Sequence, residues 1–571
     1  MRIALITSQW PGVRLGGIGA YTVHCARALA QAGHEVHVFT TTLPADAVVP
    51  EGVEVHQVAS LAEYGMAGKM PAAWAYAVRD GGDAMYRLLT GVLISEEVRR
   101  VHGRWPLDVI EVPEYEALGL PLVVTRIAKG TGHVPVVTQL HSGSAIAREV
   151  MGAAAAEDDA MREGLELAQM LRSDGLCAPS RAVVGDTHRA YGSLGVALDA
   201  EVMGLPFGAP VGDFVPPADG AAVLFVGRLE YLKGAHLLAE AAAIFLAKFP
   251  EARLRIAGPD TMLTPPPPQP GSGSMEAWMR KRLADAGMDI AARVTFLGEQ
   301  SRQGLEGELR RCAFVVVPSV RESYSYVCCE ALAAGRGVVV SDQIGATEVV
   351  GEAGISFCRG DSAALADAMC EMWGDGAFRL GLSKAAYARA RGALSAEAVI
   401  AQRVAFYQDV IRGADEGRPR RVNVPASITA RVTKAFAAIS GDEPLPAREG
   451  PKSPGTRLAE ILARHQAEYR GQEGGVGFHL YGAGRHTLRL MVERTLWEIH
   501  GHRAMGIIDD HPRFAGGGEV LGLPVQSSAE AEKRLAAGDV VVLSTDAIED
   551  QFWRQTEPLR GKGVVVYRLY G

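Results

Sequence analysis

The sequence lacks the features that would place it across a membrane or on a nucleic acid. It has no run of about 18 uncharged apolar residues, and the apolar stretch after Met1 is too short for a signal peptide. It also has no excess of basic residues, since 58 Lys and Arg stand against 66 Asp and Glu, for a formal charge of -8. Surfaces that bind nucleic acids neutralise phosphates, so a nucleic acid is not an expected partner.

Cysteine is scarce, and its seven positions show none of the paired spacings of a zinc or redox motif. Most lie among apolar neighbours, so we expect buried free thiols and a cytoplasmic protein, at most peripherally attached to a membrane. With 571 residues, of which 48% are hydrophobic and 22% charged, the chain is too long for one core. Several domains are therefore expected.

Short apolar runs alternate with longer helix-like segments, which is typical of parallel sheets covered by helices. The pattern predicts one doubly wound Rossmann-like domain over residues 1–205 and a second over residues 206–412. The second range opens with a Gly/Pro-rich linker at 206–217. A proline-rich stretch at 265–274 is expected to be an exposed insertion. The predicted strands are 3–7, 36–40, 108–112, 134–141, 176–179, 222–227, 254–258, 294–297, 314–318 and 338–341.

Residues 413–475 are predicted to form a linker with short helices, and a third, smaller Rossmann-like α/β unit is expected over 476–571. Within the linker, a helix at 427–439 places Ile428 and Val432 on an apolar stripe and Arg431 off it. Such a helix either packs onto its own protein or lies on an anionic membrane.

Two glycines, Gly16 and Gly17, separate the first predicted strand from a helix expected around residues 21–31. The N-terminus of a helix leaves backbone N–H groups unpaired, and a phosphate is their natural partner. Tight turns use glycines as well, so this motif by itself allows either explanation.

Two cations, Arg228 and Lys233, follow the predicted strand 222–227 at the start of the next helix. Ligands of open α/β sheets bind at the carboxyl ends of the strands, where both side chains would project. Either cation alone would be an ordinary solvated side chain, so the assignment depends on a second polar group in the same domain.

That second group follows the predicted strand 314–318, where Glu322 lies in a loop and Glu330 on the second turn of a helix. Carboxylates accept hydrogen bonds from the hydroxyls of ribose and hexose, while arginine and lysine neutralise a diphosphate. Together the two groups predict a pocket for a sugar nucleotide. In this loop, the exposed backbone N–H groups of Ser323, Tyr324 and Ser325 are expected to point at the phosphates.

In the first domain, His141 ends the predicted strand 134–141, which places an imidazole at the carboxyl edge that faces the second domain. A single histidine in such a place is more often structural than functional. Glu114 and Glu116, after the strand 108–112, are similarly placed, although a solvated loop explains them equally well.

These motifs, together with residues 345–351 and a closing segment at 394–407, resemble the pattern of family 4 retaining glycosyltransferases of the GT-B fold. The resemblance covers residues 1–412 and implies that the closing helices cross back to the first domain. The sequence departs from the family at Ser325 and Tyr326, where a glycine followed by an aliphatic residue or proline is commoner. The sugar subsite, and with it the donor, is left open.

The resemblance implies that Gly17 and its loop meet the diphosphate, and that Arg228 and Lys233 hold its oxygens. The remaining roles would fall on side chains that bind hydroxyl groups, Glu330 for the ribose and both Glu322 and His141 for the transferred sugar. No metal ligand and no cofactor besides the donor is expected, since cations and helix N-termini would stabilise the departing diphosphate. In similar enzymes the acceptor hydroxyl is thought to attack from the leaving-group face, which preserves the anomeric configuration.

The last unit has a glycine turn at Gly482 and Gly484 after an apolar run, followed by a second run that ends at Asp509 and Asp510. This is a dinucleotide-type arrangement, but Thr487 stands where a third glycine or alanine would be expected. The unit resembles the small Rossmann-type domain that precedes the catalytic part of bacterial sugar acyltransferases, where it binds a nucleotide sugar. A ligand-free interaction domain is an equal alternative.

The sequence thus predicts a metal-independent hexosyltransferase that moves a sugar from a nucleoside diphosphate to a glycan, as in polysaccharide biosynthesis, to a lipid-linked precursor or to a small molecule. Two alternatives stay open. A GT-B-fold epimerase would act on the donor itself, and a sugar-nucleotide sensor would bind it without chemistry.

Overall fold

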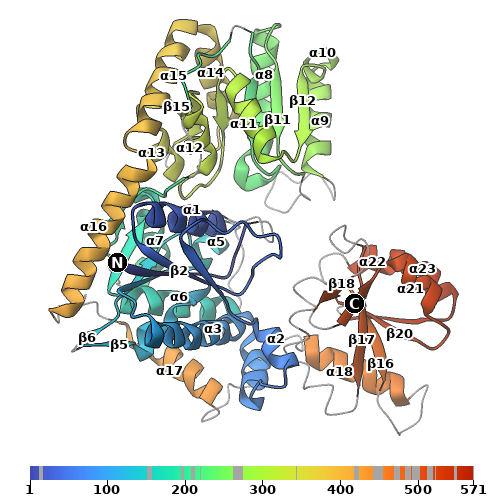
Figure 1. Cartoon of the computed structure of the whole chain (residues 1–571). Helices are drawn as coiled ribbons and strands as arrows, with labels where there is room; N and C mark the ends of the chain where they lie inside the picture. The colour runs from blue at the N-terminus through green and yellow to red at the C-terminus, as the bar shows by residue number, and fades with distance from the viewer. Residues whose placement is uncertain are drawn as a thin grey trace.

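The structure is a computed structural model, and it describes residues 1–11, 17–130, 132–150, 157–194, 198–207, 212–218, 220–260, 274–342, 344–416, 424–440, 454–467, 476–482, 490, 502–510, 518–520, 523–544 and 549–569. The predicted α/β class is confirmed, with three sheets built mainly from parallel strands and flanked by helices (Figure 1). Gly16 and residues 265–273 of the predicted insertion lie outside the described residues.

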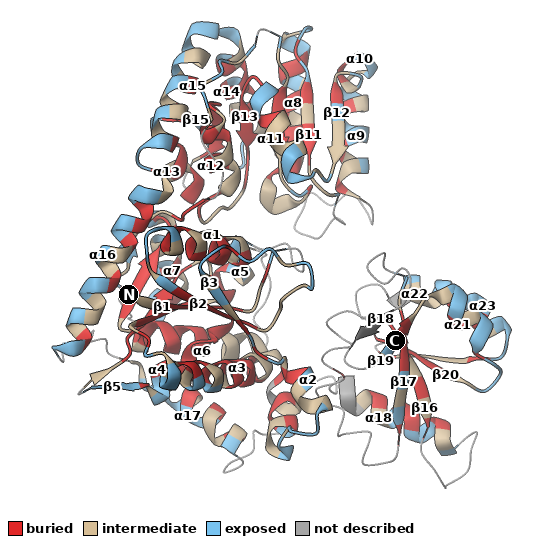
Figure 2. Cartoon of the chain, viewed as in Figure 1, coloured by how far each residue is buried: buried red, intermediate tan, exposed pale blue. Residues whose placement is uncertain are grey.

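The first sheet has seven parallel strands in the order β3-β2-β1-β4-β7-β8-β9. Its central strands are buried on both faces (Figure 2), because Ala4 and Ile6 pack into one core and Ile3 and Leu5 into another. The strands are β1 (Arg2–Thr7), β2 (Glu35–Thr40), β3 (Val53–Gln57), β4 (Val109–Pro113), β7 (Val136–Gln139), β8 (Gly175–Ala178) and β9 (Glu201–Val202).

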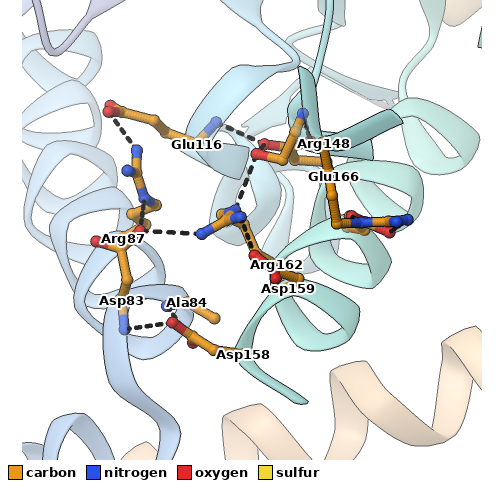
Figure 3. A network of polar contacts seen from close by, with 11 residues as sticks. Asp83, Ala84, Arg87, Glu116, Arg148, Asp158, Asp159, Arg162 and Glu166 are labelled. Atoms are coloured by element: carbon orange, nitrogen blue, oxygen red, sulfur yellow. Dashed lines mark hydrogen bonds and ion pairs between the residues drawn. The ribbon is translucent and has the colours of Figure 1, made fainter. Parts of the chain in front are cut away.

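The helices of this domain are α1 (Gly17–Gln31), α2 (Leu61–Met66), α3 (Ala72–Arg104), α4 (Leu120–Thr125), α5 (Ser144–Val150), α6 (Glu157–Arg172) and α7 (Arg181–Tyr191), and a short hairpin joins β5 (Ala128–Lys129) to β6 (Gly132–His133). The long α3 is interrupted at Gly82, whose φ of 62° is not helical. The Asp158 carboxylate of α6 accepts from the N–H groups of Asp83 and Ala84, at 3.3 and 3.2 Å, and so caps the restarted helix (Figure 3).

The second sheet has six parallel strands in the order β12-β11-β10-β13-β14-β15. They are β10 (Val223–Val226), β11 (Leu254–Ala257), β12 (Val294–Gly298), β13 (Val315–Val317), β14 (Val338–Ser341) and β15 (Gly354–Phe357). Their helices are α8 (Ala235–Lys248), α9 (Met275–Ala286), α10 (Met288–Ala291), α11 (Arg302–Arg311), α12 (Tyr326–Ala333), α13 (Gly345–Val350), α14 (Ser362–Gly374) and α15 (Gly376–Arg391).

Three strands of the first two sheets are absent from the sequence prediction, namely β3, β9 and β15. Each lies at the edge of its sheet, where one side is open and exposed residues interrupt the apolar run. The predicted strand 134–141 is also longer than β7, because the N–H of His141 turns away to the Glu114 carboxylate.

Helix α16 (Ala396–Asp415) returns from the second domain to the first, as the resemblance implies, and Figure 1 shows it running along both. Its side chains Arg403 and Tyr407 are fully buried and reach the carboxylate of Glu111 on β4, at 2.5 and 2.6 Å. The closing helix is therefore anchored to the first sheet by a buried charge pair.

Helix α17 (Ala426–Ser440) packs onto the first domain, against α3 and α6. Ile428, Val432 and Ala435 are buried there, and the Arg431 guanidinium donates to the Ala160 carbonyl at 2.5 Å. Its apolar stripe is thus covered by the chain itself rather than open to a membrane. Among the described helices, none has the length and apolar character needed to cross a membrane.

The third sheet has six strands in the order β18-β19-β17-β16-β20-β21, parallel except for the pair β18 and β19. These are β16 (Gly477–Tyr481), β17 (Arg503–Ile508), β18 (Gly518–Val520), β19 (Leu523–Gln526), β20 (Val540–Leu543) and β21 (Val565–Arg568). The helices described around it are α18 (Pro454–His465), α21 (Ser528–Arg534), α22 (Glu549–Gln555) and α23 (Glu557–Gly561).

Candidate functional site

Lys233 and Glu322 form an ion pair of 2.6 Å at the carboxyl ends of β10 and β13. These strands are neighbours. Strands β11 and β12 are added to the sheet on one side of β10, and β13, β14 and β15 are added on the other side, so the gap between β10 and β13 is the topological switch point of the second sheet. The sequence pattern placed both residues at this edge, and the structure brings them into contact.

The close approach of the two loops depends on Gly234. This residue has a φ of 70°, and a Cβ built on it would lie 1.9 Å from the Pro318 carbonyl oxygen. A hydrogen bond of 2.9 Å from the Val320 N–H to the Leu232 carbonyl holds the loops together. Any side chain at residue 234 would push Lys233 away from Glu322.

The other predicted cation, Arg228, is not part of this pair. Its side chain is 43% exposed, and its guanidinium bonds Glu230 at 2.9 Å. Glu322 instead takes its second hydrogen bond from the Ser319 hydroxyl, at 3.1 Å. Arg228 therefore lies at the expected sheet edge but apart from the Lys233 and Glu322 contact.

The loop after Glu322 presents unpaired amides. In the described part of the chain, no group accepts a hydrogen bond from the N–H of Ser323, Tyr324 or Ser325. The loop is fixed from behind, because the Ser180 hydroxyl of the first domain donates to the Ser323 carbonyl at 2.8 Å. Gly345 also touches it, since a Cβ there would lie 2.0 Å from the same carbonyl oxygen.

Ser325 explains the departure from the family pattern. Its φ of 90° is a conformation that favours glycine, and its hydroxyl caps α12 by accepting from the Cys328 N–H at 3.3 Å. Serine thus replaces the freedom of glycine with a capping hydrogen bond. The neighbouring Tyr324 ring is buried against Gly204, so only its backbone faces the loop.

Glu330 lines a separate pocket between α11 and α12, and no hydrogen bond or ion pair joins it to Glu322 in the described chain. Burial raises the pKa of its carboxyl to about 6, and the nearby Arg302 opposes that rise. The pocket combines carboxylates, cations and apolar groups: Gly212, Asp213, Val215, Arg302, Leu305, Glu306, Leu309, Arg310, Ala333 and Ala334.

In the first domain, His141 lines a small cavity together with Ile18, Thr22 and Tyr21 at the start of α1. Its Nε2 atom is buried without a hydrogen-bond partner. Burial, helped by the charge of Arg403, lowers the pKa of this imidazole to about 3, so the ring is neutral at pH 7. A neutral ring can exchange a hydrogen bond with a sugar hydroxyl.

Gly17, the glycine predicted to meet the diphosphate, is the first residue of α1.

The solvated-loop explanation of Glu114 is wrong, because Glu114 is 2% exposed. It accepts hydrogen bonds from the N–H groups of His141 and Ser142, at 2.6 and 2.7 Å. Burial raises the pKa of its carboxyl to about 8, against those hydrogen bonds. Glu114 thus positions the backbone of His141.

Glu116 is also buried, at 6% exposure, and it points away from the site. Its carboxylate pairs with Arg87 of α3, and its N–H donates to the Glu166 carboxylate of α6 at 3.1 Å (Figure 3). The backbone of Glu116 has a φ of 74°, which this network holds in place. Glu116 is therefore structural.

Glu111 and Arg403 were not singled out by the sequence analysis. Glu111 accepts from the hydroxyls of Tyr21 and Tyr407 as well as from Arg403, and Arg403 also donates to Gln139 at 2.9 Å. The only signal in the sequence is an acidic residue inside an apolar strand. That signal indicates a buried partner but does not identify it.

Comparisons with known proteins identify the class. Residues 15–195 match the family described as Glycosyltransferase Family 4, and residues 220–375 match Glycosyl transferases group 1. The chain is 31% identical over 368 residues to D-inositol 3-phosphate glycosyltransferase of Mycolicibacterium smegmatis, covering 62% of this chain and 75% of that protein. It is 28% identical over 437 residues to glycogen synthase of Mycobacterium tuberculosis, covering 74% and 97%.

Solved structures agree on the fold. Sucrose-phosphate synthase of Thermosynechococcus elongatus superposes with a TM-score of 0.52 at 21% identity, over 72% of this chain and 99% of that one. HepE of Anabaena, in complex with UDP and glucose, superposes with a TM-score of 0.50 at 17% identity, over 72% and 100%. Two Rossmann-like sheets, each matched by a glycosyltransferase family model, define a GT-B glycosyltransferase. The chain belongs to the family 4 and group 1 glycosyltransferases.

Proposed function

We propose that this glycosyltransferase moves a sugar from a nucleoside diphosphate to an acceptor with retention of configuration and without a metal at the transfer site. The observation that carries the proposal is Lys233, held at the switch point beside the unpaired amides of Ser323, Tyr324 and Ser325. A departing diphosphate gains negative charge on its oxygens, and an ammonium with oriented N–H groups stabilises that charge.

Both members of the ion pair are accessible to a donor. Lys233 is 28% exposed, so a phosphate can reach its ammonium, while Glu322, at 13%, keeps an oxygen for a sugar hydroxyl. In this proposal, Gly17 and the neutral ring of His141 contact the donor from the first domain. Arg228 is exposed enough to exchange Glu230 for a phosphate oxygen.

UDP-glucose is the first donor to test, because a structural neighbour was crystallised with it. A matching donor at 100 times its dissociation constant is expected to stabilise the protein by about 2.7 kcal/mol in a thermal-shift screen. The acceptors to test are an inositol phosphate, a glycan primer and a lipid-linked glycan. The first two are suggested by the names of the relatives.

The product distinguishes the mechanisms. Retention predicts that the new glycosidic bond has the anomeric configuration of the donor, as measured by proton NMR of the purified product. An inverted product would contradict the proposal, and so would transfer that stops in a chelator while the protein stays folded. Donor turnover to an epimer without acceptor would favour the epimerase alternative, and binding without turnover the sensor.

Replacing Glu330 by glutamine tests the ribose contact. The Glu330 carboxylate has a pKa of about 6, and a deprotonated carboxylate accepts hydrogen bonds from two ribose hydroxyls. Donor affinity is therefore expected to fall as the pH drops through about 6, and Glu330→Gln should weaken binding roughly tenfold and remove this pH dependence. Calorimetry with the intact donor at pH 5.5 and 7.5 measures both effects. Equal pH dependence in the variant would remove Glu330 from the site, and Glu371→Gln, on the exposed face of α14 outside this pocket, is the matched control.

For the C-terminal unit we propose nucleotide-sugar binding at its own switch point, between β16 and β20. Polar groups gather at the same end of the sheet beside this point, after β16, β17 and β19, where the Tyr481 hydroxyl lies 2.6 Å from the Ser528 hydroxyl and the Ser528 N–H donates to Asp510 at 2.7 Å. Equilibrium dialysis should then count two donor molecules per chain. A single molecule per chain would favour the interaction domain.

We place the reaction in the cytoplasm. All seven cysteines are free thiols, and six of them are buried, which suits a reducing compartment. Membrane contact is not part of the proposal, because the apolar stripe of α17 is already covered by α3 and α6. A lipid-linked acceptor would have to approach through another surface.

A further inference from the structure

Two buried histidines meet a carboxylate at the edge of the first sheet, outside the transfer site. His37 on β2 lies beside Glu54 on β3, and His56 lies two residues further along β3 on the same face. The His37 and His56 side chains are 1% and 8% exposed, and Glu54 is 53% exposed. Among the described residues, this is the one group of three such side chains whose ligand atoms converge.

The hydrogen bonding of His37 fixes which of its nitrogens faces the group. Its Nε2 lies 3.2 Å from the Glu35 carboxylate, and the same carboxylate pairs with Arg2 at 2.7 Å. An ionised carboxylate only accepts, so Nε2 carries the hydrogen and Nδ1 presents a lone pair. A carboxylate behind a histidine in this way is the usual support of a metal-binding imidazole.

The three inward atoms are spaced as ligands of one ion. His37 Nδ1 lies 2.9 Å from His56 Nε2 and 3.6 Å from a Glu54 oxygen, and His56 Nε2 lies 3.9 Å from the other Glu54 oxygen. Tetrahedral zinc with bonds of about 2.0–2.2 Å separates its ligands by about 3.3–3.6 Å, and the three distances span that range. A hydrogen bond between the two rings explains the first distance but not the position of the carboxylate.

We propose that His37, His56 and Glu54 bind a divalent transition-metal ion of the Zn²⁺ type, which fastens the edge strand β3 to β2. Two imidazoles and one carboxylate favour zinc over magnesium or calcium, which prefer oxygen ligands alone. The exposed side of Glu54 leaves the fourth position to water. The rings of Phe39 and Trp105, with centroids 4.7 Å from His56 and 6.1 Å from His37, shield the other side. No residue of this group belongs to the transfer site.

The test uses the full chain, stripped of metal by dialysis against a chelator, and Co²⁺ as a spectroscopic probe. One Co²⁺ per chain is expected to bind with the visible absorption of a four-coordinate ion, and Zn²⁺ should displace it and raise the Tm. His56→Gln and Glu54→Gln should each weaken Zn²⁺ binding at least about tenfold, and Glu35→Gln about 10-fold to 100-fold. Glu51→Gln, on the exposed turn before β3, is the matched control and should bind normally.

Each other outcome overturns the proposal. Absence of Co²⁺ absorption and of retained Zn²⁺ would mean that His56 simply donates a hydrogen bond to His37. Binding that persists undiminished in both His56→Gln and Glu54→Gln would belong to another part of the chain. Glu54→Gln keeps the shape of an exposed side chain, so its result remains informative if His56→Gln does not fold.

Discussion

Lys233→Ala is expected to lower kcat for sugar transfer about 100-fold to 1000-fold, with a much smaller change in KM. The ammonium is placed to stabilise charge that develops on the departing diphosphate, and removing one such group from a preorganised site has an effect of this size. Steady-state kinetics with the donor found in the stabilisation screen measure the change. Lys233→Arg keeps the positive charge and should recover part of the rate.

The matched control is Lys281→Ala. Lys281 also forms an ion pair of 2.6 Å with a carboxylate, that of Asp285, but on the exposed helix α9. Its loss should leave kcat and KM unchanged, because surface ion pairs contribute little. An unchanged kcat in Lys233→Ala, or an equal loss in both variants, would rule out the assignment of Lys233 to the diphosphate.

Arg403→Met is expected to destabilise the protein by about 3–5 kcal/mol, the second large effect. Arg403 and Glu111 are 0% and 3% exposed, so the variant leaves a buried carboxylate without its cation. The substitution also removes a second contact between α16 and the first sheet, since the same guanidinium bonds Gln139. Urea unfolding followed by tryptophan fluorescence measures the change.

Arg412→Met serves as the comparison on the same helix. Arg412 pairs with Asp409 at 2.6 Å, but both side chains are more than half exposed, at 59% and 75%. This variant should change the free energy of unfolding by less than about 0.5 kcal/mol. Adding Glu111→Gln to Arg403→Met should recover part of the loss, because the uncompensated charge is then gone. Equal stability of Arg403→Met and Arg412→Met would show that the buried pair does not anchor α16.

The central strands could be predicted from the sequence, since β14 agrees with the prediction at both ends and β1, β10 and β11 agree within a residue or two. Such strands are covered by helices on both faces and so appear as continuous apolar runs. The edge strands β3 and β15 could not be predicted this way, because only one residue of each is buried and the others are partly or fully exposed. The metal-binding group proposed above includes two residues of β3, which is one reason why sequence reasoning missed it.

The candidate site was predictable as a set of residues but not as a set of contacts. Lys233 and Glu322 were each placed at a strand end, and their contact requires Gly234 to lie against the Pro318 carbonyl. Glu114 and Glu116 occupied equivalent positions in the sequence. Only the fold shows that Glu114 supports the backbone of His141, whereas Glu116 turns toward Arg87.

The sequence by itself determined the α/β class, the positions of the buried strands and the chemical types that follow them, because hydrophobic periodicity and residue chemistry are local properties. The tertiary structure decided which of these groups meet. Lys233 and Glu322 are far apart along the chain, as are Glu111 and Arg403, and each pair is joined only when the sheets and α16 assemble. Burial then decides charge, as for the neutral ring of His141, because solvent exclusion depends on every element packed around a group.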